Sequence, residues 1–243
     1  MLLVITRPEV LQGALVRTEA AAISSLFDQG LQLLHLRKPD ADLAGLKNLV
    51  GCLNTEHRSR IVIHPPRKLI TQQGIENGCH LLLNWMQDCG LSRLHIASWL
   101  REMDSFWQHR WLPGKTGMKL LYSTGIHCWA ELDRLMAEGW GYPFSHVLVS
   151  PVLDSISKAG YRADPSLMQI PSWIPGTVRS KLFAMGGIGP AALPVIKASG
   201  FQGAALLGSI WSALHADKKS QWQAGIFSQF KICVDIWKNV LTD

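Results

Sequence analysis

The segment 150–161, SPVLDSISKAGY, carries the residues best suited to chemistry. It follows the apolar run 146–149, which is typical of a buried parallel strand. Ser155 and Ser157 supply two hydroxyls, and Lys158 supplies a cation. Hydroxyls donate hydrogen bonds to phosphate oxygens, and an ammonium group adds positive charge. The loop therefore suits a phosphorylated small molecule, with a solvated serine-rich loop as the alternative.

Two later loops offer bare backbone N–H groups. Gly186 and Gly187 follow the strand-like run 181–184, and Gly208 and Ser209 follow the run 203–207. Each loop precedes a helix-like segment, whose N-terminal dipole favours an anion. A Gly-Gly pair alone indicates a tight turn. Two such loops in this order indicate the phosphate site that recurs in parallel barrels.

Strand-like and helix-like segments alternate along the chain, and this positions the loops. The expected strands are 2–5, 31–36, 61–63, 80–83, 119–122, 147–149, 182–185 and 203–207, and the expected helices are 17–29, 43–53, 68–74, 128–138, 191–199 and 219–240. Eight such units predict an α/β fold, a single-domain (β/α)8 TIM barrel over residues 1–243. An open doubly wound sheet is the alternative, but no G-x-G-x-x-G follows the first strand.

The range 84–117 interrupts this alternation of strands and helices. It holds four tryptophans, Trp85, Trp99, Trp107 and Trp111. We interpret it as an elaborated loop plus helix that covers the site or mediates an oligomer contact, with core filling as the alternative.

In a parallel barrel, ligands bind where the strands end. The side chains expected there are mostly polar, cationic or histidine, and they are Thr6, Arg7, His35, Arg37, Lys38, His64, Asn84, Ser123, Thr124, His127, Ser150, Ser155, Ser157, Lys158, Gly186, Gly187, Gly208 and Ser209. A rim of this composition predicts an anionic ligand.

Composition limits the class of protein. With 47% hydrophobic and 17% charged residues, the 243-residue chain can bury a large core. The N-terminal apolar run fits a first strand better than a signal peptide, and no run is long enough to span a membrane. The five cysteines are odd in number and form no C-x-x-C pair. We therefore expect a cytoplasmic protein with reduced thiols and no membrane partner.

The net charge of +6 favours anionic partners. Ten tryptophans could stack on nucleic acid bases, but the cations are spread along the chain rather than gathered in one helix or arm. We therefore expect a phosphorylated small-molecule substrate and no nucleic acid.

Five motifs, in order and spacing, resemble the superfamily of thiamin phosphate synthase and the TenI-like thiazole tautomerases. They are LHLRKP at 34–39, YSTGIHC at 122–128, SPVLDSISK at 150–158, MGGI at 185–188 and AALLGSI at 204–210. The resemblance covers nearly the whole chain apart from 84–117. It implies a (β/α)8 barrel, a homo-oligomer, and a thiazole phosphate whose phosphate is surrounded by Ser155, Ser157, Gly187 and Ser209.

The synthase branch of this superfamily needs Mg²⁺, held by aspartates after the third and fourth strands. Here the first of these positions reads IHPPR at 63–67, and histidine is a poor Mg²⁺ ligand. The branch also has Arg-x-Lys after the second strand, whereas this chain has Arg37-Lys38-Pro39. No metal or other cofactor is therefore expected. Mg²⁺ would be needed only by a synthase with relocated ligands, for which Asp88 and Asp154 are the candidates.

The tautomerase branch needs no metal, because it moves protons, and histidine titrates in the right range for that task. His127 matches the family's catalytic histidine, with a local capping role as the alternative. His35 and His64 are candidate auxiliary acid/base or carboxylate-binding groups, or else ordinary strand-end residues. Arg37 would hold a carboxylate or second anion. A nucleophilic pair of Cys128 with His127 is disfavoured, because sequence neighbours at a helix start do not face each other.

Three functions follow from these observations. The favoured one is a metal-independent tautomerase-type enzyme acting on a thiazole phosphate. The first alternative is a thiamin phosphate synthase, a transferase that joins thiazole phosphate to a pyrimidine diphosphate. The second is a non-catalytic barrel that binds thiazole or thiamin phosphate. Strict Mg²⁺ dependence would indicate the synthase, and tight binding without turnover would indicate the binder.

Overall fold

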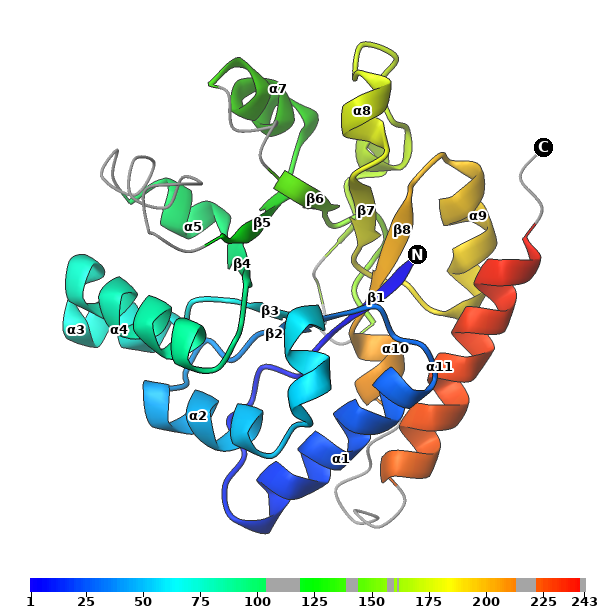
Figure 1. The fold of residues 1–243 in the computed structure, drawn as a ribbon. Coiled ribbons are helices and arrows are strands. Elements are labelled where there is room, and N and C mark those ends of the chain that lie inside the picture. Colours follow the sequence, from blue (N-terminus) through cyan, green and yellow to red (C-terminus); the bar gives the residue numbers. More distant parts are fainter. Residues whose placement is uncertain (104–118, 139–143, 157–159, 161, 213–221, 241–243) are drawn as a thin grey trace.

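Eight parallel strands close into a barrel in chain order, β1 to β8, with β8 returning to β1 (Figure 1). This computed structural model describes residues 1–103, 119–138, 144–156, 160, 162–212 and 222–240. The strands are β1 (Leu2–Ile5), β2 (Leu33–Leu36), β3 (Ile61–Ile63), β4 (Arg93–Ile96), β5 (Leu121–Ile126), β6 (Phe144–Val149), β7 (Leu182–Met185) and β8 (Gly203–Leu206). The predicted (β/α)8 barrel is confirmed.

Helices surround this barrel (Figure 1). The α-helices are α1 (Ala14–Asp28), α2 (Leu43–Gly51), α3 (Arg67–Gln73), α4 (Ile75–Asp88), α5 (Ser98–Arg101), α7 (Trp129–Ala137), α8 (Gly176–Arg179), α9 (Leu193–Ala198), α10 (Gly208–Trp211) and α11 (Trp222–Asn239). Short 3-10 turns are η1 (Thr55–Arg60), η2 (Pro165–Met168) and η3 (Pro190–Ala192). Asp42 caps the N-terminus of α2, since its side chain accepts a hydrogen bond from the backbone of Gly45 at 2.8 Å.

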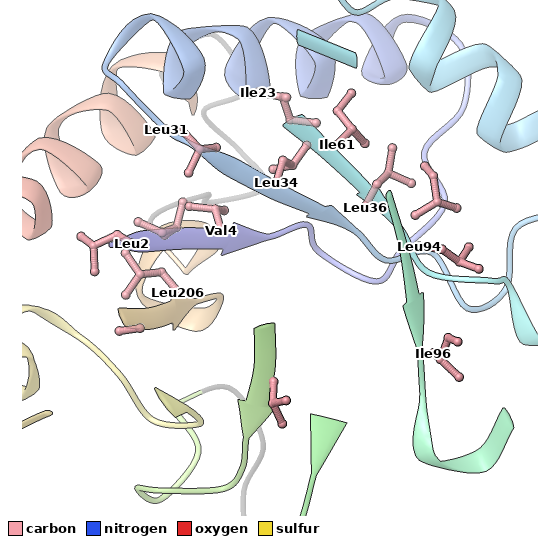
Figure 2. Close-up of a cluster of buried hydrophobic side chains, with 14 of the residues drawn as sticks. Leu2, Val4, Ile23, Leu31, Leu34, Leu36, Ile61, Leu94, Ile96 and Leu206 are labelled. Carbon is pink, nitrogen blue, oxygen red and sulfur yellow. The ribbon is translucent and has the colours of Figure 1, made fainter. Parts of the chain in front are cut away.

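The core has two parts, because strand residues alternate between the two faces of the sheet. The larger part lies between the sheet and the helices. Figure 2 shows Leu2, Val4, Leu34, Leu36, Ile61, Leu94, Ile96 and Leu206 of the strands in this layer, together with Ile23 of α1 and Leu31. A second, separate cluster fills the barrel interior and consists of Leu3, Ile5, Leu33, Val62, Leu148, Phe183 and Ala205. In the part of the barrel formed by β2 to β6, polar side chains occupy some of the interior positions.

The prediction of a fourth strand at 80–83 is wrong. These residues lie in α4, whose buried residues Cys79, Leu82, Trp85 and Met86 recur at helical spacing and form one apolar face. A short apolar run does not by itself distinguish a strand from a buried helix. The fourth strand is instead β4, which lies inside the range 84–117. Residues 104–117 of that range, with Trp107 and Trp111, lie outside the described residues.

The other predicted elements agree with the structure to within a few residues. The largest strand shift is at β5, which begins at Leu121 and extends to Ile126. Among the described helices, none is both long and apolar enough to cross a membrane.

Candidate functional site in the barrel mouth and interior

Four histidines lie together inside the barrel. They are His35 on β2, His64 directly after β3, His95 on β4 and His146 on β6, with exposed fractions of 0%, 8%, 5% and 3%. Strand alternation places them there. Leu34 and Leu36 flank His35, and Leu94 and Ile96 flank His95, and all four of these apolar residues pack in the outer layer (Figure 2). The histidines between them therefore face inward.

A chain of hydrogen bonds joins three of these rings. His64 Nε2 lies 2.9 Å from His35 Nδ1, and His35 Nε2 lies 2.8 Å from His146 Nε2. His146 Nδ1 is 3.1 Å from the hydroxyl of Ser145, which donates its own proton to the carbonyl of Tyr122 at 2.8 Å.

The bond from the Ser145 hydroxyl to the Tyr122 carbonyl sets which atom donates in every hydrogen bond of this series, when the rings are neutral. Because the Ser145 hydroxyl proton is engaged, Ser145 accepts from His146 Nδ1–H. His146 Nε2 then accepts from His35 Nε2–H, and His35 Nδ1 accepts from His64 Nε2–H. His35 thus carries its lone pair on Nδ1.

His95 completes the cluster through ring contacts. Its ring stacks on His64 with centroids 4.0 Å apart and an interplanar angle of 18°. Its Nδ1 lies 3.0 Å from the hydroxyl of Ser123 on β5. The sheet register explains this pairing, since His95 is opposite Ser123 and Ser123 is opposite His146.

Burial keeps these four rings neutral. Desolvation holds the pKa values of His35, His64 and His95 well below the usual histidine value. Neighbouring positive charge lowers the pKa values further, from Arg37 for His64 and from Arg101 and then Arg37 for His95. The pKa of His146 is lowered to about 4, first by burial and then by the charge of Arg93. At neutral pH all four are therefore uncharged imidazoles.

His127 lies apart from this cluster, just beyond the end of β5, and its side chain is exposed. Its Nδ1 is 3.0 Å from the carbonyl oxygen of Ser150, the residue that follows β6. Because a carbonyl only accepts, Nδ1 carries the proton in the neutral ring, and Nε2 carries a lone pair. His127 is therefore oriented as a proton acceptor.

A buried arginine holds the segment around His127. The backbone N–H of His127 donates to Glu131 at 2.6 Å, and the other carboxylate oxygen of Glu131 lies 3.4 Å from Arg101. Arg101 also donates to the carbonyl of Gly125 at 2.9 Å and to the Thr124 hydroxyl. These contacts fix the end of β5 against the start of α7.

The loops after β6, β7 and β8 meet at the same end of the barrel. A Cβ atom at Gly187 would lie 2.2 Å from the carbonyl oxygen of Asp154, so the β6 and β7 loops touch where only glycine fits. A Cβ at Gly189 would lie 3.8 Å from both Ile156 and Ser209. Segments from three loops thus converge, as expected for a shared ligand site.

Ser209 is the polar group at this junction. Its hydroxyl is buried and has no hydrogen-bond partner among the described residues. α10, which carries it, is held against β1 by the indole N–H of Trp211, which donates to the carbonyl of Ile5 at 2.6 Å. A buried hydroxyl without a partner is costly, and a ligand oxygen would supply the missing bond.

The structure brings many of the predicted site residues to this region. Ser150, Ser155, Gly186, Gly187, Gly208 and Ser209 lie on the three converging loops, and Arg37 lies half-buried just after β2. Ser123 lies deeper, in the barrel interior against His95. Ser157 and Lys158 lie outside the described residues.

Lys38, in contrast, is engaged elsewhere. Its ammonium group contacts both carboxylate oxygens of Glu19 at 2.7 and 2.9 Å and the carbonyl of Glu9 at 2.7 Å. Both Lys38 and Glu19 are buried. The lysine therefore tethers the β2 loop to α1 and is not presented to a ligand.

Two described segments of the barrel mouth lack the carboxylates that a synthase-type Mg²⁺ site would use. The segments that follow β3 and β4 read HPPR at 64–67 and ASWLR at 97–101, without a carboxylate. Asp88 lies at the last turn of α4, and Asp154 accepts a hydrogen bond from the backbone of Ala163 at 2.7 Å. Mg²⁺ prefers oxygen ligands, which these two segments do not supply as side-chain carboxylates.

Three contributors were missed from the sequence: His95, His146 and Arg101. The alternation in Arg93-Leu-His-Ile96 would have revealed His95, had that segment been recognised as a strand. His146 begins the apolar run 146–149, and that run alone does not show that its side chain faces inward. Arg101 gave no local signal, since its role depends on contacts to β5 and α7.

No family model matches the sequence, and neither does any curated protein. Solved structures do share its fold. Thiamine phosphate pyrophosphorylase from Bacteroides thetaiotaomicron matches with a TM-score of 0.68 and 21% identity, over 98% of this chain and 97% of that one. The enzyme of the same name from Pyrococcus furiosus gives 0.61 and 11%, over 99% and 96%. A 3-hexulose-6-phosphate synthase gives 0.61 and 14%, over 97% and 99%. At these identities the likeness shows the barrel fold.

Proposed function

We propose that this protein is an enzyme that acts on a small phosphorylated substrate, most like a thiazole phosphate, by tautomerase-type proton transfer. The observation that carries the proposal is the bond from His127 Nδ1 to the carbonyl of Ser150. Ser150 begins the β6 loop, which runs into the phosphate-loop junction at Asp154 and Ile156. The proton acceptor is thus anchored to the loop that would hold the substrate phosphate.

The phosphate would bind where the β6, β7 and β8 loops converge. The Ser209 hydroxyl would donate to a phosphate oxygen, and the backbone at Gly186 and Gly187 allows close approach. Thiamine phosphate pyrophosphorylase and hexulose-6-phosphate synthase, which share the fold, are both named for phosphorylated compounds. That agreement supports a phosphorylated substrate.

Proton transfer would then proceed through His127 alone. Nε2 accepts a proton from a substrate carbon, the electron pair shifts along the ring system, and the imidazolium returns a proton to a different atom. No proton is gained or lost overall, and the step requires neither a metal nor a redox partner. Arg37, at the end of β2, would pair with a substrate carboxylate.

The test compares His127→Gln with His80→Gln, a change at an exposed position on α4. The substrate is a thiazole carboxylate phosphate, and proton exchange and isomerisation are followed by NMR. We expect His127→Gln to bind substrate nearly as well but to lose turnover by about 10²- to 10⁴-fold, whereas His80→Gln retains it. Equal turnover in both variants would remove His127 from the mechanism.

A parallel reaction addresses the synthase alternative. The purified protein is incubated with thiazole phosphate, a pyrimidine diphosphate and Mg²⁺, and the formation of thiamin phosphate is measured. Robust Mg²⁺-dependent product would replace the proposed function by the transferase. Tight binding of thiazole phosphate, without exchange, isomerisation or product, would instead indicate a non-catalytic binder.

A further inference from the structure

The histidine cluster inside the barrel is not used by the proposed proton transfer. The candidate ligand atoms of His35, His64 and His95 lie within 4.8 Å of one another, and all three residues are buried. His35 and His95 lie on β2 and β4, and His64 directly follows β3, where its backbone N–H donates to the carbonyl of Leu36 at 3.0 Å. The sheet therefore holds the three backbones in place. Among the described residues, no carboxylate belongs to this group. Convergent buried imidazoles are unusual in a barrel interior, which apolar side chains normally fill.

The hydrogen bonds around the cluster already arrange two rings for coordination. His35 directs its other nitrogen, Nε2–H, to His146, and its Nδ1 lone pair faces His64. His95 can donate Nδ1–H to Ser123, which leaves its Nε2 lone pair available. Histidine ligands of metals characteristically donate their second N–H to such an acceptor, which fixes the tautomer and the ring orientation.

The distances are compatible with a metal centre after small side-chain movements. A tetrahedral centre with metal–nitrogen bonds of about 2.1 Å places its donors about 3.4 Å apart. His35 Nδ1 and His64 Nε2, now 2.9 Å apart, would separate slightly as the metal replaces the proton they share. The rings of His64 and His95 would rotate out of their present stacking to converge on the same ion.

We propose that His35, His64 and His95 form a three-histidine site for a divalent transition metal, for which Zn²⁺ is the best match. Imidazole nitrogen suits Zn²⁺, Cu²⁺, Ni²⁺ and Fe²⁺, whereas Mg²⁺ and Ca²⁺ require oxygen. The site is therefore distinct from the Mg²⁺ site of a synthase. His146 is a positioning residue, because it holds His35 through Nε2 without being among the three proposed ligands.

The surrounding charge predicts what completes the coordination. Arg37 is positive and close enough to influence both His64 and His95. It opposes a bare dication but stabilises an anion bound at the open fourth position of a three-histidine centre. Both the metal and the positive charge of Arg37 would thus favour an anionic ligand at that position.

Metal binding can be measured without substrate, so its outcome is independent of the proposed function. The full-length protein is stripped with a chelator and titrated with Co²⁺, whose visible absorption is intense in a four- or five-coordinate site and weak in an octahedral one. We expect one Co²⁺ per chain with the intense spectrum, displaced by Zn²⁺ and not by Mg²⁺. A wild-type protein that binds no Co²⁺, or gives only the weak octahedral spectrum, would overturn the proposal.

Matched variants locate the site. His35→Ala and His95→Ala should abolish the intense spectrum, whereas His80→Ala and His127→Gln should retain it. His146→Asn should weaken metal affinity by about 10- to 100-fold and alter the spectrum, because His35 loses its orienting partner. Retention of the full spectrum in both His35→Ala and His95→Ala would place the metal elsewhere and refute the assignment.

Circular dichroism establishes that each variant is folded. If the ligand variants do not fold, X-ray absorption of the wild-type zinc protein decides instead. Imidazole scattering from three rings, with one further oxygen or chloride ligand, is the expected result. Sulfur ligation or mainly carboxylate ligation is the opposing result.

Discussion

The ammonium group of Lys38 lies 2.7 and 2.9 Å from the two carboxylate oxygens of Glu19, and the two side chains are only 3% and 2% exposed. This buried pair joins the loop after β2 to α1, at a position where the sequence had suggested a ligand-binding cation. Its isolation from water makes each partner depend on the other, because an unpaired buried charge is far more costly than an unpaired exposed one.

Lys38→Met should therefore destabilise the protein strongly, by about 3–5 kcal/mol in the free energy of unfolding, since it leaves Glu19 buried without its partner. The double variant Lys38→Met/Glu19→Leu should recover most of that loss, because it removes both charges. Urea denaturation measures both effects. Lys47→Met, at an exposed position on α2, is the control and should change stability by about 0.5 kcal/mol or less. A double variant as unstable as Lys38→Met would contradict this account.

The buried histidines make the metal-free protein sensitive to acid. In the folded state the pKa of His146 is about 4, whereas it is near 6.5 in an unfolded chain. Between these values the unfolded state binds the proton and the folded state does not, so stability falls as pH decreases from about 6.5 to about 4. One such group contributes up to about 1.4 kcal/mol per pH unit. His35, His64 and His95, whose pKa values are lowered in the same direction, steepen the loss.

Denaturation curves recorded with chelator at several pH values test this prediction. His146→Gln should flatten the dependence of unfolding free energy on pH between about 4 and 6.5, because one proton-linked group is removed. An identical slope in His146→Gln and the wild type would show that His146 does not contribute to acid sensitivity.

Local patterns in the sequence were sufficient for the barrel but not for its polar interior. The predicted bounds of β1, β3 and β7 are correct at both ends, because each is a short apolar run that stops at a polar residue or a glycine. The run at 80–83 was misassigned, since a four-residue window cannot separate a helical face from a strand. Because the strand at 93–96 was not predicted, the inward-facing position of His95 was not predicted either. The convergence of His35, His64, His95 and His146 depends on closure and register, which bring together residues separated by up to 111 positions in the chain.

In the candidate site too, local sequence predicts some features, whereas others depend on the three-dimensional fold. Residue type and order predict a ligand site at the loops after β6, β7 and β8, because glycine and serine after a strand carry a clear local signal. The structure shows that these loops converge. Lys38 carried an equally clear signal, yet the structure directs it to Glu19. Only the three-dimensional position of α1 reveals that competing partner.

Gly187 tests the contact between the β6 and β7 loops. It has a φ of 65°, and an added Cβ would lie 2.2 Å from the carbonyl oxygen of Asp154. Gly187→Ala should therefore displace the loops, lower stability by about 1–3 kcal/mol and weaken binding of a phosphorylated ligand. Gly90→Ala is the matched control, since Gly90 has a φ of 68° but no atom within 4 Å of its added Cβ. Gly90→Ala should lower stability through backbone strain alone and should leave the affinity for the phosphorylated ligand unchanged. Equal ligand affinity in the two variants would contradict a role for the loop contact in binding.

The variant Ser209→Ala tests ligand binding and protein stability separately. The buried hydroxyl of Ser209 has no partner among the described residues, so Ser209→Ala removes an unsatisfied polar group without breaking a bond. We expect unchanged or higher stability, by up to about 1 kcal/mol, together with weaker binding of thiazole phosphate. Thermal unfolding and calorimetric titration measure the two quantities on the same sample. Ser212→Ala, one turn further along at the C-cap of α10, serves as the control for changes near this helix and should leave ligand affinity unaltered. A Ser209→Ala variant that binds thiazole phosphate as tightly as the wild type would show that this hydroxyl does not contact the ligand. A variant that instead loses substantial stability would show that the hydroxyl has a bonding partner in the folded protein.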